Sequence, residues 1–143
     1  MPQRTYDPKA VTAAFGEVLL SGFAEGTFIK ASRDKDRFTK KVGARGEVTR
    51  IKVNDRSGRV EVTLDQSSPV NDYLQAIALQ DEAANAGVRS FSIVDHLGTT
   101  YVHAENSWIV KDPDVEEGTD LTTRTWIFDL AEMIKFVGGS FAT

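Results

Sequence analysis

The sequence predicts a mainly β protein with one α-helix, built as an antiparallel β-sandwich or barrel. Val, Ile and Thr account for 34 of the 143 residues, against 8 Leu, and side chains that branch at Cβ suit a pleated sheet better than a helix. Several runs of strand length alternate apolar and polar residues between turn-forming residues. Only one segment has a helical period, so we expect one helix to cover an end or a face of the strands.

The composition is that of one folded domain, which we take as residues 1–143. Apolar residues make up 41% and charged residues 27% of the chain, so it should fold rather than remain disordered. The chain has no cysteine, which excludes disulfide bonds, thiolate metal sites and a cysteine nucleophile. No apolar run approaches the roughly 18 residues that span a bilayer, and residues 1–9 lack the order of a signal peptide. We therefore expect a soluble protein of a reducing cytoplasm with no membrane partner.

The first half of the chain predicts four strands. The first covers residues 10–20, and the second, residues 27–32, has the short alternation of an edge strand. Residues 47–53 and 59–64 alternate more clearly. Because the turn-forming residues 54–58 separate these two runs, we expect them to form a hairpin.

The helix is expected at residues 69–86. Ser68 can cap it, Pro69 suits the first helical position, Asp72 is favourable in the first turn, and Gly87 can end it. The apolar stripe of this helix has the spacing i, i+3, i+4, i+7 and i+8, and its members are Val70, Tyr73, Leu74, Ile77 and Ala78.

The second half predicts another hairpin and a closing strand. Residues 89–94 and 99–110 are runs of β-formers joined by a four-residue loop that ends in Gly98. Residues 122–137 alternate apolar and polar positions, which favours one long strand. A short helix over residues 129–136 is the alternative for its second part.

The charge is divided along the chain. Residues 30–59 hold eleven Lys or Arg and four Asp or Glu, a net charge of +7, whereas the rest of the chain holds six and seventeen, a net charge of -11. This division has three possible meanings: a solvated surface loop, a nucleic-acid site, or self-association in which the basic segment of one copy meets an acidic surface of the next. The nucleic-acid site would place basic side chains on phosphates, but an acidic chain repels a polyanion. Its residues would be Lys40, Lys41, Arg45, Arg50 and Lys52.

The chain offers little for catalysis, and we expect no enzyme and no cofactor. A zinc site from His96, His103 and one carboxylate is disfavoured, because His103 is expected to lie on a strand. A triad of Ser92 or Ser107 with His96 and Asp95 is disfavoured because no Gly-x-Ser-x-Gly motif is present. Residues 43–46 are too short for a phosphate loop and are expected to mark a bend or bulge in a long strand. Trp108 and Trp126 suit the core or an interface, and the carboxylate pairs Asp81-Glu82 and Glu116-Glu117 suit a solvated surface.

Scattered motifs over nearly the whole chain carry a family resemblance. They are residues 42–50, 54–58, 60–64 and 66–74, together with Tyr6-Asp7-Pro8, Arg124-Thr125-Trp126 and Val137-Gly138-Gly139. In these motifs the chain resembles the tail tube proteins of contractile-tailed bacteriophages. The motifs are structural and carry no chemical signature, so they point to the family and leave the role of each residue open.

The resemblance implies a β-sandwich or barrel of the phage tail tube type that forms stacked rings, expected to be hexameric. Sheets of neighbouring subunits would join into one barrel around a channel for the genome. The implied partners are further copies of the chain, the tail sheath, baseplate and tail terminator proteins, and the tape measure protein and DNA that pass through the channel. The implied location is the virion tail, after assembly in the host cytoplasm.

We expect a projecting basic arm at about residues 33–46 that docks on the acidic face of a neighbouring ring. The basic or apolar contact residues would be Arg33, Lys35, Arg37, Phe38, Lys40, Lys41 and Arg45. The acidic contact residues would be Asp112, Asp114, Glu116, Glu117 and Asp120. The alternatives are a tube or ring component of a related contractile injection or secretion system, a tail completion protein, a small ligand-binding β-barrel, and a metal-dependent hydrolase.

Overall fold

The computed structural model describes residues 5–139, which form ten strands, a short 3₁₀-helix and one α-helix. The predicted domain therefore extends at each end beyond the described residues. The elements in chain order are η1 (Pro8–Ala10), β1 (Val11–Phe15), β2 (Val18–Leu19), β3 (Ile29–Arg33), β4 (Phe38–Val42), β5 (Val48–Lys52), β6 (Gly58–Asp65), α1 (Val70–Ala84), β7 (Arg89–Asp95), β8 (Tyr101–Lys111), β9 (Thr123–Leu130) and β10 (Ile134–Phe136).

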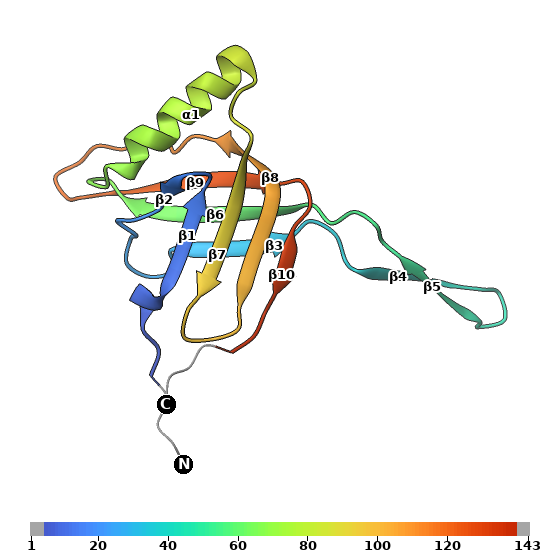
Figure 1. Cartoon of the computed structure of the whole chain (residues 1–143). Helices are drawn as coiled ribbons and strands as arrows, with labels where there is room; N and C mark the ends of the chain where they lie inside the picture. The colour runs from blue at the N-terminus through green and yellow to red at the C-terminus, as the bar shows by residue number, and fades with distance from the viewer. Residues whose placement is uncertain (1–4, 140–143) are drawn as a thin grey trace.

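Two antiparallel layers cross at a steep angle and share the long strand β8 (Figure 1). The first part of β8 pairs with β7 and β10, and β7 continues the layer to β1 and β2. The last part of β8 pairs with β9, which continues to β6 and β3. The register shifts between Ile109 and Lys111, and such a bulge bends a strand. The predicted β-sandwich with one helix is confirmed.

The core lies between the two layers and is filled by aromatic side chains. Phe15, Phe91 and Phe128 are fully buried, with ring centroids 4.9 to 6.2 Å apart. They come from β1, β7 and β9, so they join the two layers directly. Apolar burial of this kind contributes about 2 kcal/mol for each large side chain.

Helix α1 covers one end of the sandwich, as predicted (Figure 1). Val70, Leu74 and Ile77 are buried from the predicted stripe, whereas Tyr73 is exposed. The indole N–H of Trp126 donates to Oδ1 of Asn71 over 2.9 Å, which ties the helix to β9 and confirms Trp126 as a core residue. Trp108 is only partly buried on β8.

The predicted ends of the helix are slightly wrong. Pro69 precedes the first helical residue instead of occupying it, although Ser68 Oγ does accept a hydrogen bond from the Val70 N–H over 3.3 Å. At the other end Asn85 adopts the left-handed conformation with φ 53°, which ends the helix before Gly87.

The predicted hairpin of residues 47–53 with 59–64 is wrong. Strand β5 pairs with β4, whereas β6 pairs with β3 and β9. Both runs are strands, as predicted, but residues 53–57 lead the chain from one sheet into another instead of reversing it. The run 10–20 is likewise two strands, because Gly16 adopts φ 61° and a tight turn follows β1.

In the second half, the hairpin of β7 and β8 is confirmed. Residues 122–137 are not one strand, because the chain turns at residues 131–133 and continues as β10 on the opposite layer. The buried side chain of Met133 occupies this turn. The alternative helix over 129–136 is also absent, since β9 extends to Leu130 and β10 begins at Ile134. Among residues 5–139, β3 pairs with β6 alone, which confirms the predicted edge strand.

Candidate assembly surfaces

Strands β4 and β5 form a two-stranded arm that extends away from the sandwich (Figure 1). All ten residues of these strands are exposed. The turn at residues 43–47 is closed by hydrogen bonds from the Gly43 N–H to the Glu47 carbonyl (2.7 Å) and from the Gly46 N–H to the Gly43 carbonyl (3.0 Å), with φ 88° at Gly46. This segment is the tip of a hairpin, so the predicted bend in a long strand is wrong. The arm continues to Lys52, beyond the expected end at residue 46.

The register of the arm gives it two unlike faces. Phe38 is opposite Lys52, Lys40 is opposite Arg50, and Val42 is opposite Val48. Side chains of directly opposite residues lie on the same face of an antiparallel pair. The basic–apolar face therefore consists of Phe38, Lys40, Val42, Val48, Arg50 and Lys52. The opposite face consists of Thr39, Lys41, Thr49 and Ile51.

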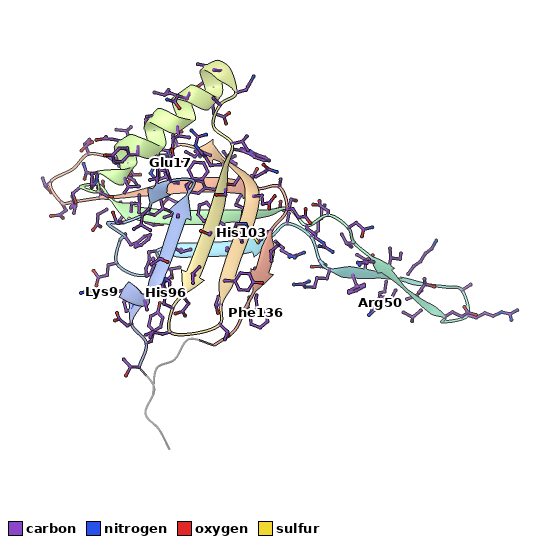
Figure 2. The ribbon with its side chains drawn as sticks, viewed as in Figure 1. Lys9, Glu17, Arg50, His96, His103 and Phe136 are labelled. Atoms are coloured by element: carbon purple, nitrogen blue, oxygen red, sulfur yellow. The ribbon has the colours of Figure 1, made fainter. Side chains whose placement is uncertain are left out.

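Within the basic–apolar face, the Arg50 guanidinium lies 4.1 Å from the centre of the Phe38 ring. Figure 2 shows Arg50 on the arm, well separated from the labelled residues of the sandwich. The contact is a cation–π pair. It holds a positive charge and an aromatic ring together on an exposed surface.

The base of the arm is fixed to the sandwich at the turn between β9 and β10. The Arg33 side chain donates to the Met133 carbonyl over 3.1 Å, and the Met133 N–H donates to the Arg56 carbonyl over 2.8 Å. Burial of the Arg33 guanidinium, together with the positive charges of Arg37 and Arg56, lowers the pKa of Arg33 below its usual value. Arg33 thus belongs to the sandwich rather than to the exposed arm.

The predicted acidic segment, residues 112–120, connects β8 to β9 beside α1. Asp112 accepts a hydrogen bond from Gln75 on the helix over 3.1 Å. Glu117 accepts from Gln66 (2.7 Å) and Arg124 (3.2 Å), and Glu116 accepts through its backbone carbonyl from Thr122. Asp114 and Asp120 are exposed. The structure therefore gives Glu117 partners within its own chain and brings Asp112 to the helix.

A groove of roughly 300 Å³ separates α1 from the end of β8. Its carboxylates are Asp81 and Glu82 from the helix and Asp112 from the strand end, and its apolar side chains include Leu79 and Val110. Leu79 is 56% and Val110 43% exposed. This acidic groove was missed in the sequence because Asp81 and Glu82 are far from Asp112 along the chain.

The two layers separate at the side where β3 is the free edge. There an open cleft of roughly 450 Å³ is lined by apolar side chains that include Ile29 and Ala31 of β3, Ile93 of β7 and Val102 of β8. Within the part of the chain that the structure describes, β10 pairs on one side only, with β8. The sandwich therefore has free strand edges next to an apolar cleft.

The histidines lie in the sandwich and away from the arm (Figure 2). Nε2 of His96 is 3.0 Å from the Thr12 hydroxyl, and His103 pairs with Ile134 in the ladder of β8 and β10. Over residues 5–139, no three His, Cys, Asp or Glu side chains are placed to share a metal ion. In the same residues, no helix has the length and apolarity needed to cross a membrane.

A family model described as "Bacteriophage PhiTE tail tube protein" matches residues 9–138. The chain belongs to this tail tube family. The match includes the arm, both layers and α1, so every surface described above lies within the family domain. A structural role in the phage tail follows.

Other proteins resemble this family member in sequence or fold. "Structural protein ORF10" of Pseudomonas phage KPP10 is 28% identical over 144 residues, which cover 95% of this chain and 83% of that protein. The sheath/tube terminator of the extracellular contractile injection system PVC has a TM-score of 0.58 at 11% identity, covering 94% of this chain and 99% of that one. The anti-feeding prophage cap has a TM-score of 0.59 at 9% identity, covering 95% and 93%.

A chain from the PVC sheath–tube complex gives a TM-score of 0.57 at 11% identity and covers 92% of the tail tube family member and 91% of its own length. At such low identities these likenesses show the fold alone. The fold is therefore shared by chains from tube complexes and from tube ends, and it does not by itself separate these two roles.

Proposed function

We propose that this chain is the tube subunit of a contractile phage tail and that it works as a polymer of stacked rings, expected to be six-membered. The arm is the observation that carries the proposal. A pair of five-residue strands with every residue exposed buries little in its own subunit, and an isolated two-stranded hairpin is only marginally stable. A neighbouring copy supplies the contacts that such an arm lacks.

The free edges support the same proposal. An unpaired edge offers backbone N–H and C=O groups to a strand of another chain, and closure into a ring removes such edges. Strands β3 and β10 are edges beside an apolar cleft. Neighbouring subunits in a ring would continue the sheets at these edges and cover the cleft.

In this role the ring stack forms the conduit through which the genome passes into the host cell. A net charge of -4 suits that task, because a basic wall would release counterions on binding DNA and retain the polymer. The sheath would surround the tube, the baseplate and tail terminator proteins would contact its ends, and the tape measure protein and DNA would occupy the channel. Assembly would take place in the host cytoplasm before incorporation into the virion.

The second candidate is a ring at the end of the tube, as in a terminator or completion protein. It is favoured by the fold likeness to a sheath/tube terminator and to a tube cap. Electron microscopy separates the two roles: the tube subunit forms open-ended tubes, whereas a terminator forms single closed rings.

The arm is tested by reversing its charge in the variant Lys40→Glu, Lys41→Glu, Arg45→Glu. Because each exposed ion pair contributes only about 0–1 kcal/mol, this variant reverses three charges of the arm at once. We expect folded subunits and no tubes in negative-stain images. The control is the charge-conserving variant Lys40→Arg, Lys41→Arg, Arg45→Lys, which should form tubes. Normal tubes from the reversed variant would refute a docking role for the arm.

A further inference from the structure

We propose that the arm docks through one face only, the basic–apolar face, and that its receptor is the acidic groove between α1 and β8 of a second copy. This inference rests on the proposed function, since it concerns how subunits of the polymer meet. It names a face that the sequence does not indicate, because the sequence predicts Arg50 and Lys52 in a different hairpin.

The distribution of positive charge indicates that the basic–apolar face is the docking face. Lys40, Arg50 and Lys52 lie on the basic–apolar face, whereas Lys41 is the one cation among the four residues of the opposite face. Lys40 and Arg50 are direct cross-strand partners, and like charges in that position destabilise a hairpin. An anionic surface placed against this face would offset the repulsion between Lys40 and Arg50, so the arrangement favours a complex.

The exposed apolar residues of the arm indicate the same docking face. Phe38, Val42 and Val48 are 41, 58 and 64% exposed and share the face with the three cations, whereas Ile51 is the single large apolar residue of the opposite face. Apolar anchors surrounded by charged groups are typical of protein–protein contacts. A face of this composition fits a partner surface that combines carboxylates with apolar side chains.

The acidic groove has that composition. Three carboxylates, from Asp81, Glu82 and Asp112, border the exposed side chains of Leu79 and Val110. The Gly87 N–H donates to Oδ1 of Asp81 over 3.1 Å, and the Gln75 amide donates to Oδ2 of Asp112 over 3.1 Å. These bonds orient two of the carboxylates, and each carboxylate accepts through both oxygens. Three positive charges of the arm thus meet three negative charges of the groove.

The positions of the two surfaces require two copies. The arm extends away from the sandwich and from α1 (Figure 1), so the arm of one copy does not reach its own groove. A contact between two different surfaces of identical chains is heterologous, and it either closes into a ring or continues as an open filament. Both outcomes are compatible with a polymer of stacked rings.

The two faces are distinguished by a matched pair of variants, Lys40→Glu and Lys41→Glu. The two substitutions make the same change of charge at adjacent exposed positions of β4, and they differ only in the face that carries them. We expect Lys40→Glu to raise the critical concentration for tube assembly about tenfold or more, measured by pelleting and electron microscopy. Lys41→Glu should remain within about twofold of the wild type. Equal effects, or a larger effect of Lys41→Glu, would overturn the one-faced arm.

The groove is tested by Glu82→Lys, with Asp114→Lys as a control in the acidic segment outside the groove. We expect Glu82→Lys to impair assembly and Asp114→Lys to leave it near the wild type. The double variant Lys40→Glu, Glu82→Lys should recover tubes, because every reversed arm then meets a reversed groove in the next copy. A double variant no better than the product of the two single effects, or a stronger effect of Asp114→Lys, would overturn the pairing.

Circular dichroism and thermal melting establish that each variant is folded. Tube formation by the wild type distinguishes a failure of this inference from a failure of the proposed function. If the wild type forms no tubes, the function itself fails. If the wild type forms tubes but the matched variants do not differ, the docking face fails and the function stands.

Discussion

At the scale of the residue, close packing under the arm favours glycine at position 58. A Cβ at this position would lie 2.8 Å from the Ser32 carbonyl oxygen and would collide with the Met133 side chain. Because the carbonyl belongs to the paired strand β3, the backbone does not move aside easily. Gly58 therefore allows the close approach of β3 and the 131–133 turn at the point where the arm leaves the sandwich.

We predict that Gly58→Ala lowers the free energy of unfolding by about 1–3 kcal/mol, the usual cost of overpacking. Gly118→Ala is the matched control, because a Cβ at Gly118 has no heavy atom within 4 Å, and it should be neutral. Chemical denaturation of the two variants measures the difference. Equal stability of both would contradict the packing described at β3.

A second residue-scale prediction concerns Asp55, which lies at the base of the arm. Hydrogen bonds from the Ser57 hydroxyl (2.7 Å) and the Ser57 N–H (3.0 Å) lower the pKa of the Asp55 carboxyl. Because the folded pKa lies below the unfolded one, the stabilisation is present above the unfolded pKa and is lost as the pH falls through the folded pKa.

NMR titration of the Asp55 carboxyl should therefore give a midpoint below the ordinary pKa of an aspartate. Ser57→Ala removes the hydroxyl bond and should raise this midpoint, whereas Ser57→Thr keeps a hydroxyl and should raise it less. An unchanged midpoint in Ser57→Ala would show that the turn is held by other contacts.

At the scale of the element, the arm is expected to be the least protected sheet of the free subunit. Strands β6 and β9 share an eight-residue register and bury alternate side chains in the core, whereas β4 and β5 bury none. Local opening of the arm thus exposes little new apolar surface. We predict that amides of β4 and β5 exchange faster than those of β6 and β9 in the monomer.

Hydrogen–deuterium exchange followed by mass spectrometry measures this difference. Assembly should then slow exchange in the arm, because the neighbouring copy covers it. Strong protection of β4 and β5 in the monomer would mean that the arm is held by its own subunit, against the proposed docking.

The helix and the strands differ in how well the sequence predicts them. Helix α1 and the hairpin of β7 and β8 were predictable, because a helical stripe and a short loop ending in glycine are local signals. The pairing partners of β5 and β6 were not predictable, because an alternating pattern indicates a strand but not the strand with which it pairs. The chain crosses between two sheets at residues 53–57, and only long-range pairing decides that crossing.

The candidate surfaces, too, are predicted only in part by the sequence. The basic charge of the segment predicts an arm, and the structure places four of the predicted contact residues on it: Phe38, Lys40, Lys41 and Arg45. Arg50 and Lys52 were assigned elsewhere, although the two glycines of residues 43–46 between similar runs are a hairpin signal. The acidic groove combines α1 with the end of β8, and no local pattern in the sequence brings these elements together.

At the scale of the whole molecule, an arm with a basic–apolar face, free strand edges beside an apolar cleft, and an acidic groove all lie on one small chain. In the proposed polymer, each of these surfaces would meet a complementary surface on another copy. The proposed working state of the protein is therefore the polymer, in keeping with its membership in a tail tube family.

Electron microscopy of the purified full chain over a range of concentrations tests this claim most directly, with and without a preassembled tail baseplate as a seed. We predict open-ended hollow tubes of uniform diameter, whose length increases with concentration and which grow from the seed. A subunit that remains monomeric at high concentration, even beside the baseplate, would contradict the account.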